Sequence, residues 1–174
     1  MTEILKKAAL IDLAVFDVDG VLTNGELIYT SGQHELKIFH AHDGLGLKML
    51  IRGGCEVAVI SSRKSAIVEI RMAELGIGHV YQGEEDKRSC LLALMGKLGV
   101  AQSATAYTGD DLVDLPAMQQ AGLAIAVANA HPYVIEHADW VTAKSGGSGA
   151  AREVCDLILR ARGKLDALLD EYSH

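Results

Sequence analysis

Cysteine, proline and aromatic residues are scarce in this sequence, and the scarcity of cysteine excludes some classes of protein. The three cysteines, Cys55, Cys90 and Cys155, are far apart and odd in number, which argues against a disulfide framework or a zinc site of paired cysteines. We expect them to be buried apolar side chains. Only 2 prolines and 5% aromatic residues accompany 18 glycines, a balance typical of α/β proteins rich in alanine and valine.

Long apolar runs and an excess of positive charge are also missing. Asp12 interrupts the run at residues 10–16, and no stretch approaches the roughly 18 apolar residues of a membrane span. The formal net charge of −7 argues against a nucleic-acid backbone as the main partner, although a local cationic pocket could bind a small anion. We expect a soluble, cytoplasmic protein with a single domain over residues 1–174, binding neither membrane nor nucleic acid.

Short apolar runs alternate with segments of helical spacing along the chain. Segments 65–76 and 89–99 carry apolar residues at helical spacing and end in glycine, as many helices do. The order β-α-β-α predicts an α/β fold, a doubly wound parallel sheet that places ligands at the carboxyl ends of its strands. The expected strands, each apolar and too short for a helix, are residues 10–16, 56–61, 79–83, 105–109, 123–128 and 139–142.

Two segments depart from this alternation. Residues 25–40 contain two short alternating runs around a glycine-containing turn, which predicts a small hairpin projecting from the sheet. Residues 150–170 have amphipathic spacing and predict a C-terminal helix on the core, which Gly163 would weaken or end early. The glycine-rich stretch 144–150 just before this helix is expected to be either a turn or a mobile flap.

Polar side chains gather directly after the expected strands. Because the carboxyl ends of parallel strands meet at one edge of a sheet, Asp17, Asp19 and Asp110 would face the same space. Carboxylates so near one another repel unless a cation lies among them. Mg²⁺ would suit such a site, because it prefers oxygen ligands and leaves coordination positions for a phosphate. The polar residues in question are Asp17, Asp19, Ser61, Ser62, Arg63, Lys87, Asp110, Asp111 and Asp114.

This set of residues predicts phosphoryl transfer. An aspartate can attack phosphorus while a metal and a lysine or arginine neutralise the phosphoryl oxygens, so Asp17 would be the nucleophile and Asp19 would carry protons. The sequence does not match two other ligand-binding motifs, the EF-hand loop and the dinucleotide-binding fingerprint. Val21 and Leu22 stand where an EF-hand loop needs an oxygen ligand and a glycine, and no glycine-rich stretch completes a dinucleotide fingerprint.

In their order and spacing, FDVDGVLT, VISSR, Lys87 and TGDDLVDLP resemble the four motifs of the haloacid dehalogenase superfamily of phosphatases. The resemblance implies a Rossmann-like fold of this superfamily. It implies Asp17 as the nucleophile that forms an aspartyl phosphate, and Asp19 as acid and base. Ser61 and Lys87 would bind the phosphate, and the acid at position 19 favours a phosphatase or mutase over a transport ATPase, which carries threonine there.

The same resemblance implies a metal site with Mg²⁺ as the cofactor. Asp17, the backbone carbonyl of Asp19, and Asp110 would be its ligands. Asp111 and Asp114 would be outer-shell residues beside these ligands. All four motifs fall within residues 16–116, so the implied site would be complete within this part of the chain.

Neither usual insertion point of this superfamily has room for a cap domain. Only the hairpin segment lies between Asp19 and the next expected strand, and only a helix and a strand lie between Arg63 and Lys87. The site would therefore be open to water. Since this chemistry benefits from excluding water, either a macromolecular substrate or a neighbouring subunit should cover the site. We expect the hairpin to make that contact.

From about residue 10 to 165, the chain is similar to the 3-deoxy-D-manno-octulosonate 8-phosphate phosphatase family. The stretches that add to the four motifs are residues 25–50, VYQG, AVANAHP and SGGSGAARE. This resemblance implies a capless homotetramer that releases phosphate and the sugar acid KDO for lipopolysaccharide precursor synthesis. Adjacent subunits would complete each site, and SGGSGAARE would be a tail near the neighbouring site. The implied sugar-acid contacts are Asp19, His40, Ala41, His42, Asp43, Gly44, Lys48, Arg63, Arg71 and Lys87.

Three positions depart from that family's pattern without removing a catalytic group. His42 stands where arginine is expected, Asn24 where aspartate is usual, and Ser62 where glycine is usual. A neutral imidazole holds a carboxylate less firmly than a bidentate guanidinium, so the phosphate of a nine-carbon sugar acid is an alternative substrate. A non-catalytic regulatory subunit is a second alternative, which the intact Asp17 and Asp19 disfavour.

Overall fold

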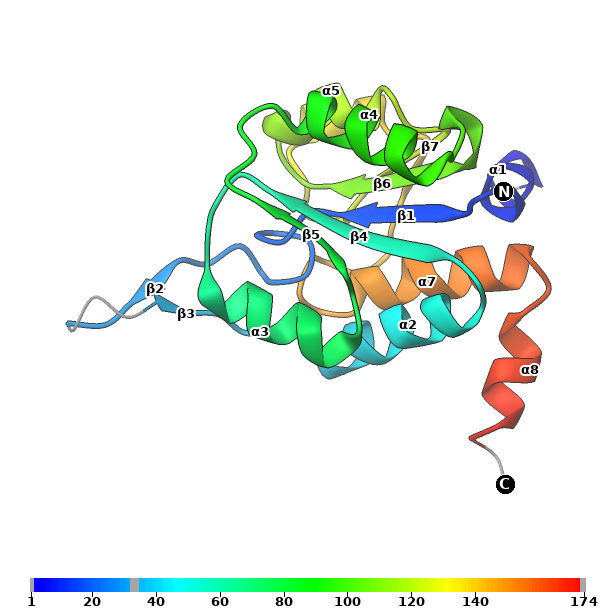
Figure 1. Ribbon diagram of the computed structural model, residues 1–174, viewed down its shortest axis with the longest axis horizontal. Coiled ribbons are helices and arrows are strands. Elements are labelled where there is room, and N and C mark those ends of the chain that lie inside the picture. The colour runs from blue at the N-terminus through cyan, green and yellow to red at the C-terminus, as the bar shows by residue number, and fades with distance from the viewer. Residues whose placement is uncertain (1, 32–34, 173–174) are drawn as a thin grey trace.

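The computed structural model describes residues 2–31 and 35–172, and its centre is a sheet of six parallel strands (Figure 1). The strand order is β5-β4-β1-β6-β7-β8. From β1 in the middle, the chain first builds β4 and β5 on one side and then β6, β7 and β8 on the other, which confirms the predicted doubly wound fold. The strands are β1 Leu13–Phe16, β4 Glu56–Ser61, β5 His79–Gln82, β6 Thr105–Gly109, β7 Leu123–Ala126 and β8 Trp140–Val141.

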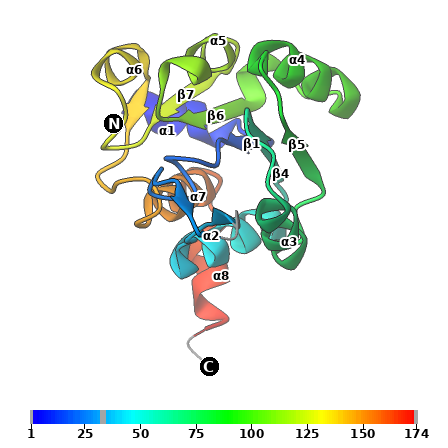
Figure 2. The ribbon, with the colours of Figure 1, turned by 90° about the vertical axis from the view of Figure 1, so that its left-hand side faces the viewer.

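Helices cover both faces of the sheet. In Figure 2, α4, α5 and α6 lie over one face, while α2, α3 and α7 lie over the other. Every residue of β1, β6 and β7 is buried, which is why β1 and β7 are apolar throughout rather than alternating. The helices are α1 Thr2–Ala9, α2 Ala41–Arg52, α3 Ala66–Leu75, α4 Lys87–Leu98, α5 Leu115–Met118, α6 Pro132–His137, α7 Ala150–Ala161 and α8 Leu165–Asp170, with short 3₁₀ turns at η1 Gln102–Ala104 and η2 Leu112–Asp114.

The region around the first strand differs from the sequence prediction. The expected strand at residues 10–16 begins only at Leu13, because helix α1 precedes it and Leu10 lies exposed between the two. Helix α2 was not predicted at all, since Gly44 and Gly46 lower its helix propensity. Both glycines are buried where another segment comes close: a Cβ on Gly46 would lie 2.7 Å from Cδ of Arg152.

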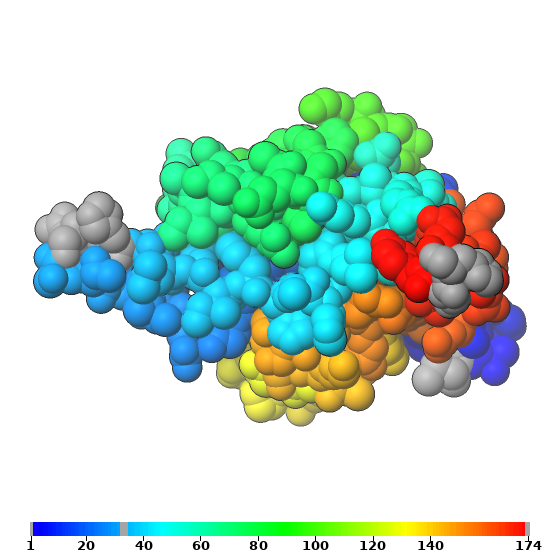
Figure 3. Space-filling model, turned by 90° about the horizontal axis from the view of Figure 1, so that it is seen from below, coloured from blue at the N-terminus to red at the C-terminus, as the bar shows by residue number. Residues whose placement is uncertain are grey.

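The predicted hairpin is present, but it is shorter than expected. Strands β2 Ile28–Tyr29 and β3 Glu35–Leu36 pair antiparallel, and the glycine of the predicted turn lies outside the described residues. Residues 37–40 leave the hairpin and lead into α2. The hairpin projects well beyond the sheet and its helices (Figure 3). The described residues add no cap domain over the carboxyl ends of the strands.

The C-terminal segment forms two helices instead of one. Gly163, with a φ of +66°, separates α7 from α8, in line with the prediction that this glycine would end the helix early. Cys55 and Cys155 are buried as expected, whereas Cys90 is only half-buried. Within the described part of the chain, no helix is both long enough and apolar enough to cross a membrane.

Candidate active site

The loop after β1, residues 17–24, turns sharply over the end of the sheet. Asp17 continues the strand for one residue, because its N–H donates to the carbonyl oxygen of Thr108 on β6 at 3.0 Å. The carbonyl of Val18 then accepts the N–H groups that close the turn. Gly20 has a φ of +98°, and a Cβ there would lie 2.0 Å from Oδ2 of Asp110. Only glycine fits this position, which explains why it directly follows the two aspartates.

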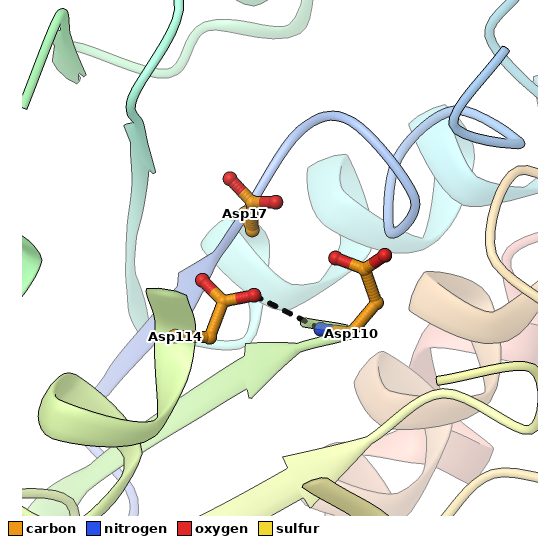
Figure 4. A group of neighbouring side chains, drawn as sticks. All are labelled: Asp17, Asp110 and Asp114. Atoms are coloured by element: carbon orange, nitrogen blue, oxygen red, sulfur yellow. Dashed lines mark hydrogen bonds between the residues drawn. The ribbon is translucent and has the colours of Figure 1, made fainter. Parts of the chain in front are cut away.

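The loop after β6 places the carboxylate of Asp114 near Asp17. Oδ2 of Asp114 accepts hydrogen bonds from the backbone N–H groups of Asp110 at 3.0 Å and Asp111 at 3.2 Å. The hydroxyl of Tyr107 donates to Oδ1 of Asp114 at 3.1 Å. Asp114 has no exposed surface, so these bonds fix its carboxylate firmly. Figure 4 shows the side chains of Asp17, Asp110 and Asp114 gathered at this edge of the sheet.

Lys87, the first residue of α4, supplies a buried cation between two of these carboxylates. Its Nζ donates to Oδ1 of Asp17 and to Oδ1 of Asp114, both at 2.7 Å. Burial alone would lower the pKa of Lys87, but the two carboxylates outweigh burial and raise it, so the lysine stays charged. The aspartates at the ends of β1 and β6 are therefore tied together through one ammonium group.

The carboxylates also fit a divalent cation. Oxygen atoms of Asp17, Asp110 and Asp114 lie within 4.8 Å of one another. Burial, together with the charge of Asp114, raises the pKa of Asp17 to about 8 and that of Asp110 to about 7. The positive charge near these two groups is therefore too small to stabilise both of them as carboxylates. Since both oxygens of Asp114 already accept hydrogen bonds, Asp17 and Asp110 are the carboxylates available to Mg²⁺.

The structure brings the sequence-predicted catalytic residues together in one cleft of about 280 Å³. Ser61, at the end of β4, is 3% exposed and accepts a hydrogen bond from the N–H of Arg63 at 3.3 Å. Asp111 caps the short turn η2 and also borders the cleft. The cleft is lined by Asp17, Asp19, Gly25, Leu27, Ser61, Ser62, Arg63, Lys87, Asp110, Asp111 and Val113.

The base of the hairpin contributes residues that the sequence reasoning missed. Lys37 donates a hydrogen bond to Oδ1 of Asp19 and lies 3.3 Å from Oε1 of Glu35, with only 2% of its side chain exposed. Nη2 of Arg63 donates to the hydroxyl of Tyr29 at 2.7 Å and to Glu35 at 3.3 Å. The signal was present in the sequence, because Glu35 and Lys37 alternate with Leu36 and Ile38 and so share one side of an extended chain.

Several predicted sugar-acid contacts lie elsewhere in this chain. His40, Asp43, Gly44 and Arg71 border a second, much smaller hollow near Leu22. Arg71 pairs with Glu74 at 3.2 Å and lies 6.0 Å from the ring centre of Phe39. Among the described residues, the lining of the catalytic cleft contains none of the following: His40, Ala41, His42, Asp43, Gly44, Lys48 and Arg71. Their contact with a sugar acid stays a prediction.

Fold and cleft together define a class of enzyme: a hydrolase with a doubly wound parallel sheet and a cluster of aspartates around a buried lysine at the end of its central strand. Residues 57–154 match the family of haloacid dehalogenase-like hydrolases. This stretch includes Ser61, Lys87 and Asp110, and it begins after Asp17 and Asp19. The chain belongs to the haloacid dehalogenase-like hydrolases, as its motifs predicted.

Curated relatives and solved structures extend the similarity over nearly the whole chain. The 3-deoxy-D-manno-octulosonate 8-phosphate phosphatase of Salmonella typhi is 48% identical over 165 residues, which cover 95% of this chain and 88% of the relative. The Moraxella catarrhalis phosphatase of the same name, solved with a magnesium ion, a phosphate ion and KDO, is 46% identical with a TM-score of 0.97 over 99% of each chain. The cobalt-bound Haemophilus influenzae phosphatase is 45% identical with a TM-score of 0.90, covering 92% of this chain and 94% of that chain.

Proposed function

We propose that this chain is a Mg²⁺-dependent phosphatase that hydrolyses 3-deoxy-D-manno-octulosonate 8-phosphate to KDO and phosphate. The observation that carries the proposal is Lys87, which bonds to Asp17 and to Asp114 and lines, with Asp17 and Asp110, a cleft open to a small anion. The choice of sugar acid rests on the relatives, which share close to half of their residues with this chain.

The proposed reaction has two steps, both at phosphorus. A carboxylate oxygen of Asp17 attacks the phosphoryl group, while Asp19 gives a proton to the departing sugar oxygen, so that KDO leaves and an aspartyl phosphate forms. Asp19 then accepts a proton from water. That water attacks phosphorus, the bond between phosphorus and Asp17 breaks, and phosphate leaves with the carboxylate restored.

The remaining residues hold the groups that react. Lys87 binds one oxygen of Asp17, which orients the other oxygen toward the cleft, and Ser61 donates its hydroxyl to the phosphoryl group. Asp114 acts through Lys87 and through the backbone N–H of Asp110, and does not itself touch the substrate. Mg²⁺, held by Asp17, Asp110 and the backbone carbonyl of Asp19, would neutralise charge on the phosphoryl oxygens.

The proposed assembly is a homotetramer in which neighbouring subunits cover each cleft. Two observations support it. First, the hairpin exposes apolar side chains that one chain leaves in water, namely Leu27, Tyr29, Leu36 and Ile38. Second, the predicted sugar-acid residues at the start of α2 lie outside the cleft of their own chain. Sedimentation should give a tetramer, and a stable monomer would remove the basis for a cover supplied by a neighbour.

A phosphate-release screen tests the proposed function. The panel contains 3-deoxy-D-manno-octulosonate 8-phosphate, the phosphate of a nine-carbon sugar acid, and simple sugar phosphates, each with Mg²⁺ and with excess chelator. We expect the eight-carbon substrate to give the highest kcat/KM, and activity to disappear with chelator. Equal inactivity on both sugar acid phosphates would refute the assigned substrate, while activity that persists without a divalent cation would refute the role of the metal.

A further inference from the structure

The glycine-rich residues 145–149, called here the glycine segment, lie directly against the loop that carries Asp17 and Asp19. The N–H of Gly147 donates to the carbonyl oxygen of Val21 at 2.9 Å. A Cβ on Gly146 would lie 1.7 Å from the carbonyl oxygen of Gly20. The two backbones are thus in contact with no side chain between them, and the segment forms a turn packed against the loop. A displacement of this segment must displace residues 17–24 as well.

Side chains hold the glycine segment near both of its ends, and Glu153 holds the two residues just before it. Oδ1 of Asn129 accepts the N–H of Gly146 at 2.9 Å. Glu153 accepts the N–H groups of residues 143 and 144 at 3.0 and 3.1 Å. At the far end, Asp43 on α2 accepts the N–H of Gly149 at 3.3 Å and that of Arg152 at 2.8 Å. Asp43 therefore serves as the cap of α7, in place of a side chain from the residue before the helix.

Asp43 suits this task because both of its oxygens are used. It is only 2% exposed, and its two acceptors meet two N–H groups at the first turn of α7. Helices α2 and α7 lie side by side in Figures 1 and 2 and pack on each other. Asparagine has the same size but presents one oxygen and an NH₂ group, so it can accept only one of these bonds.

We propose that Asp43 is a positioning residue of the phosphatase reaction. It fixes the start of α7 and the glycine segment, and through Gly146 and Gly147 it keeps the loop of Asp17 and Asp19 in the geometry needed for attack. This role acts through the backbone and is an alternative to the sugar-acid contact predicted for Asp43. Its kinetic test rests on the proposed function, and its structural test does not.

The kinetic test compares Asp43→Asn with Asp139→Asn in the full-length enzyme. Asp139 is a matched control, because its Oδ2 accepts the N–H of Ala124 at 2.9 Å near the amino end of β7, the opposite edge of the sheet. Both variants are assayed, where unfolding curves show them folded, on 3-deoxy-D-manno-octulosonate 8-phosphate and on p-nitrophenyl phosphate, which has no sugar acid. We expect Asp43→Asn to lower kcat on both substrates at least tenfold with KM within threefold, and Asp139→Asn to change kcat less than twofold.

Two results would overturn the proposal. A kcat for Asp43→Asn within twofold of the wild type on both substrates would mean that the loop does not depend on this residue. A loss confined to the sugar acid phosphate, seen mainly in KM, would instead place Asp43 in contact with the substrate.

Amide hydrogen exchange tests the same coupling without any assay of activity. We expect the Gly147 amide to exchange at least tenfold faster in Asp43→Asn than in the wild type or Asp139→Asn. Unchanged exchange would refute the coupling. If the wild-type protein released no phosphate from either substrate, the proposed function would be refuted. Hydrogen exchange would still show whether Asp43 is coupled to the glycine segment.

A second pair of variants covers the case in which Asp43→Asn does not fold. Asn129→Ala removes the acceptor for Gly146, whereas Asn129→Asp keeps an oxygen in its place. We expect at least a threefold loss of kcat in Asn129→Ala and recovery to within twofold in Asn129→Asp. No loss in the first variant, or no recovery in the second, would contradict the proposal.

Discussion

The ends of β1 and β6 and the base of the hairpin hold their charges in different ways. At the strand ends, Asp17, Lys87 and Asp114 are almost fully buried, and Lys87 bonds to both carboxylates. At the hairpin, Asp19 pairs with Lys37, just after the two-residue strand β3, and with Arg63, in the loop after β4. The first region is held by the ends of neighbouring strands and by this buried network, whereas the second depends on a few side-chain contacts. The carboxylates at the strand ends are thus held inside the core, and Asp19 is held at its edge.

The largest effect should follow from changing the nucleophile in the buried region. Asp17→Asn keeps the shape of the side chain but removes the attacking oxygen, so kcat should fall by about 10⁴-fold or more. Phosphate release measures this, and circular dichroism should show an intact fold. Asp166→Asn, at an exposed position on α8, is the control and should keep full activity. Undiminished turnover in Asp17→Asn would rule out covalent catalysis by this residue.

The next largest effect concerns the buried cation. Lys87→Met leaves the carboxylates of Asp17 and Asp114 buried without their shared partner, which should cost about 3–5 kcal/mol of unfolding free energy as well as nearly all activity. Chemical denaturation measures the loss. Lys97→Met on the same helix is exposed and should change stability little. Equal stability of the two variants would show that the buried network is not needed for the fold.

A smaller effect is expected at the hairpin. Lys37→Met removes the hydrogen-bond donor to Asp19, so the proton carrier should lose its orientation and kcat should fall roughly 10- to 100-fold. Because Lys37 is not near Asp17 or Asp110 in the bonded network, the Kd of Mg²⁺ should stay within a few-fold of the wild type. Steady-state kinetics and a Mg²⁺ titration measure the two quantities. A large change in the Kd would mean that hairpin and metal site are not separate regions.

The smallest predicted effect is a pH dependence of metal binding. In the metal-free protein the pKa values of Asp17 and Asp110 are raised to about 8 and 7, so protons compete with Mg²⁺ below these values. Because these folded-state values exceed those of the unfolded chain, the metal-free fold should lose stability as the pH rises from about 4 to 8. Stabilisation by Mg²⁺ should grow over the upper part of that range, because fewer protons must be displaced from Asp17 and Asp110. Thermal unfolding at pH 6 and pH 8 measures this, and a larger shift at pH 6 would contradict it.

The core and the catalytic cleft could be predicted from the sequence because their signals are local. Apolar runs marked all six strands, and the polar residues after them met at one edge because parallel strands share their direction. The positions of Asp17, Asp19 and Asp110 in the cleft could be predicted without knowing any contact between distant parts of the chain. Helix α2 could not be predicted, because its two glycines lower the helix propensity of the segment. Glycine is needed there because Arg71 and Arg152, from elsewhere in the chain, come close to the helix.

What could not be predicted depends on pairs of residues far apart in the sequence. The bond between Lys37 and Asp19 requires the path of the hairpin back to the cleft, and no periodicity fixes that path. The capping of α7 by Asp43 joins residues 109 positions apart. The sequence also left open whether the glycine segment is a turn or a mobile flap, and in the structure it forms a turn packed on the backbone of Gly20.

The most direct test of the account is to find the phosphoryl group on the protein. Enzyme mixed with 3-deoxy-D-manno-octulosonate 8-phosphate labelled in its phosphate and quenched in acid during turnover should carry the label on the peptide that contains Asp17. The label should be absent in Asp17→Asn and should disappear from the wild type when unlabelled substrate is added before the quench. Rapid phosphate release with no label on that peptide at any time would contradict the claim that Asp17 is the nucleophile.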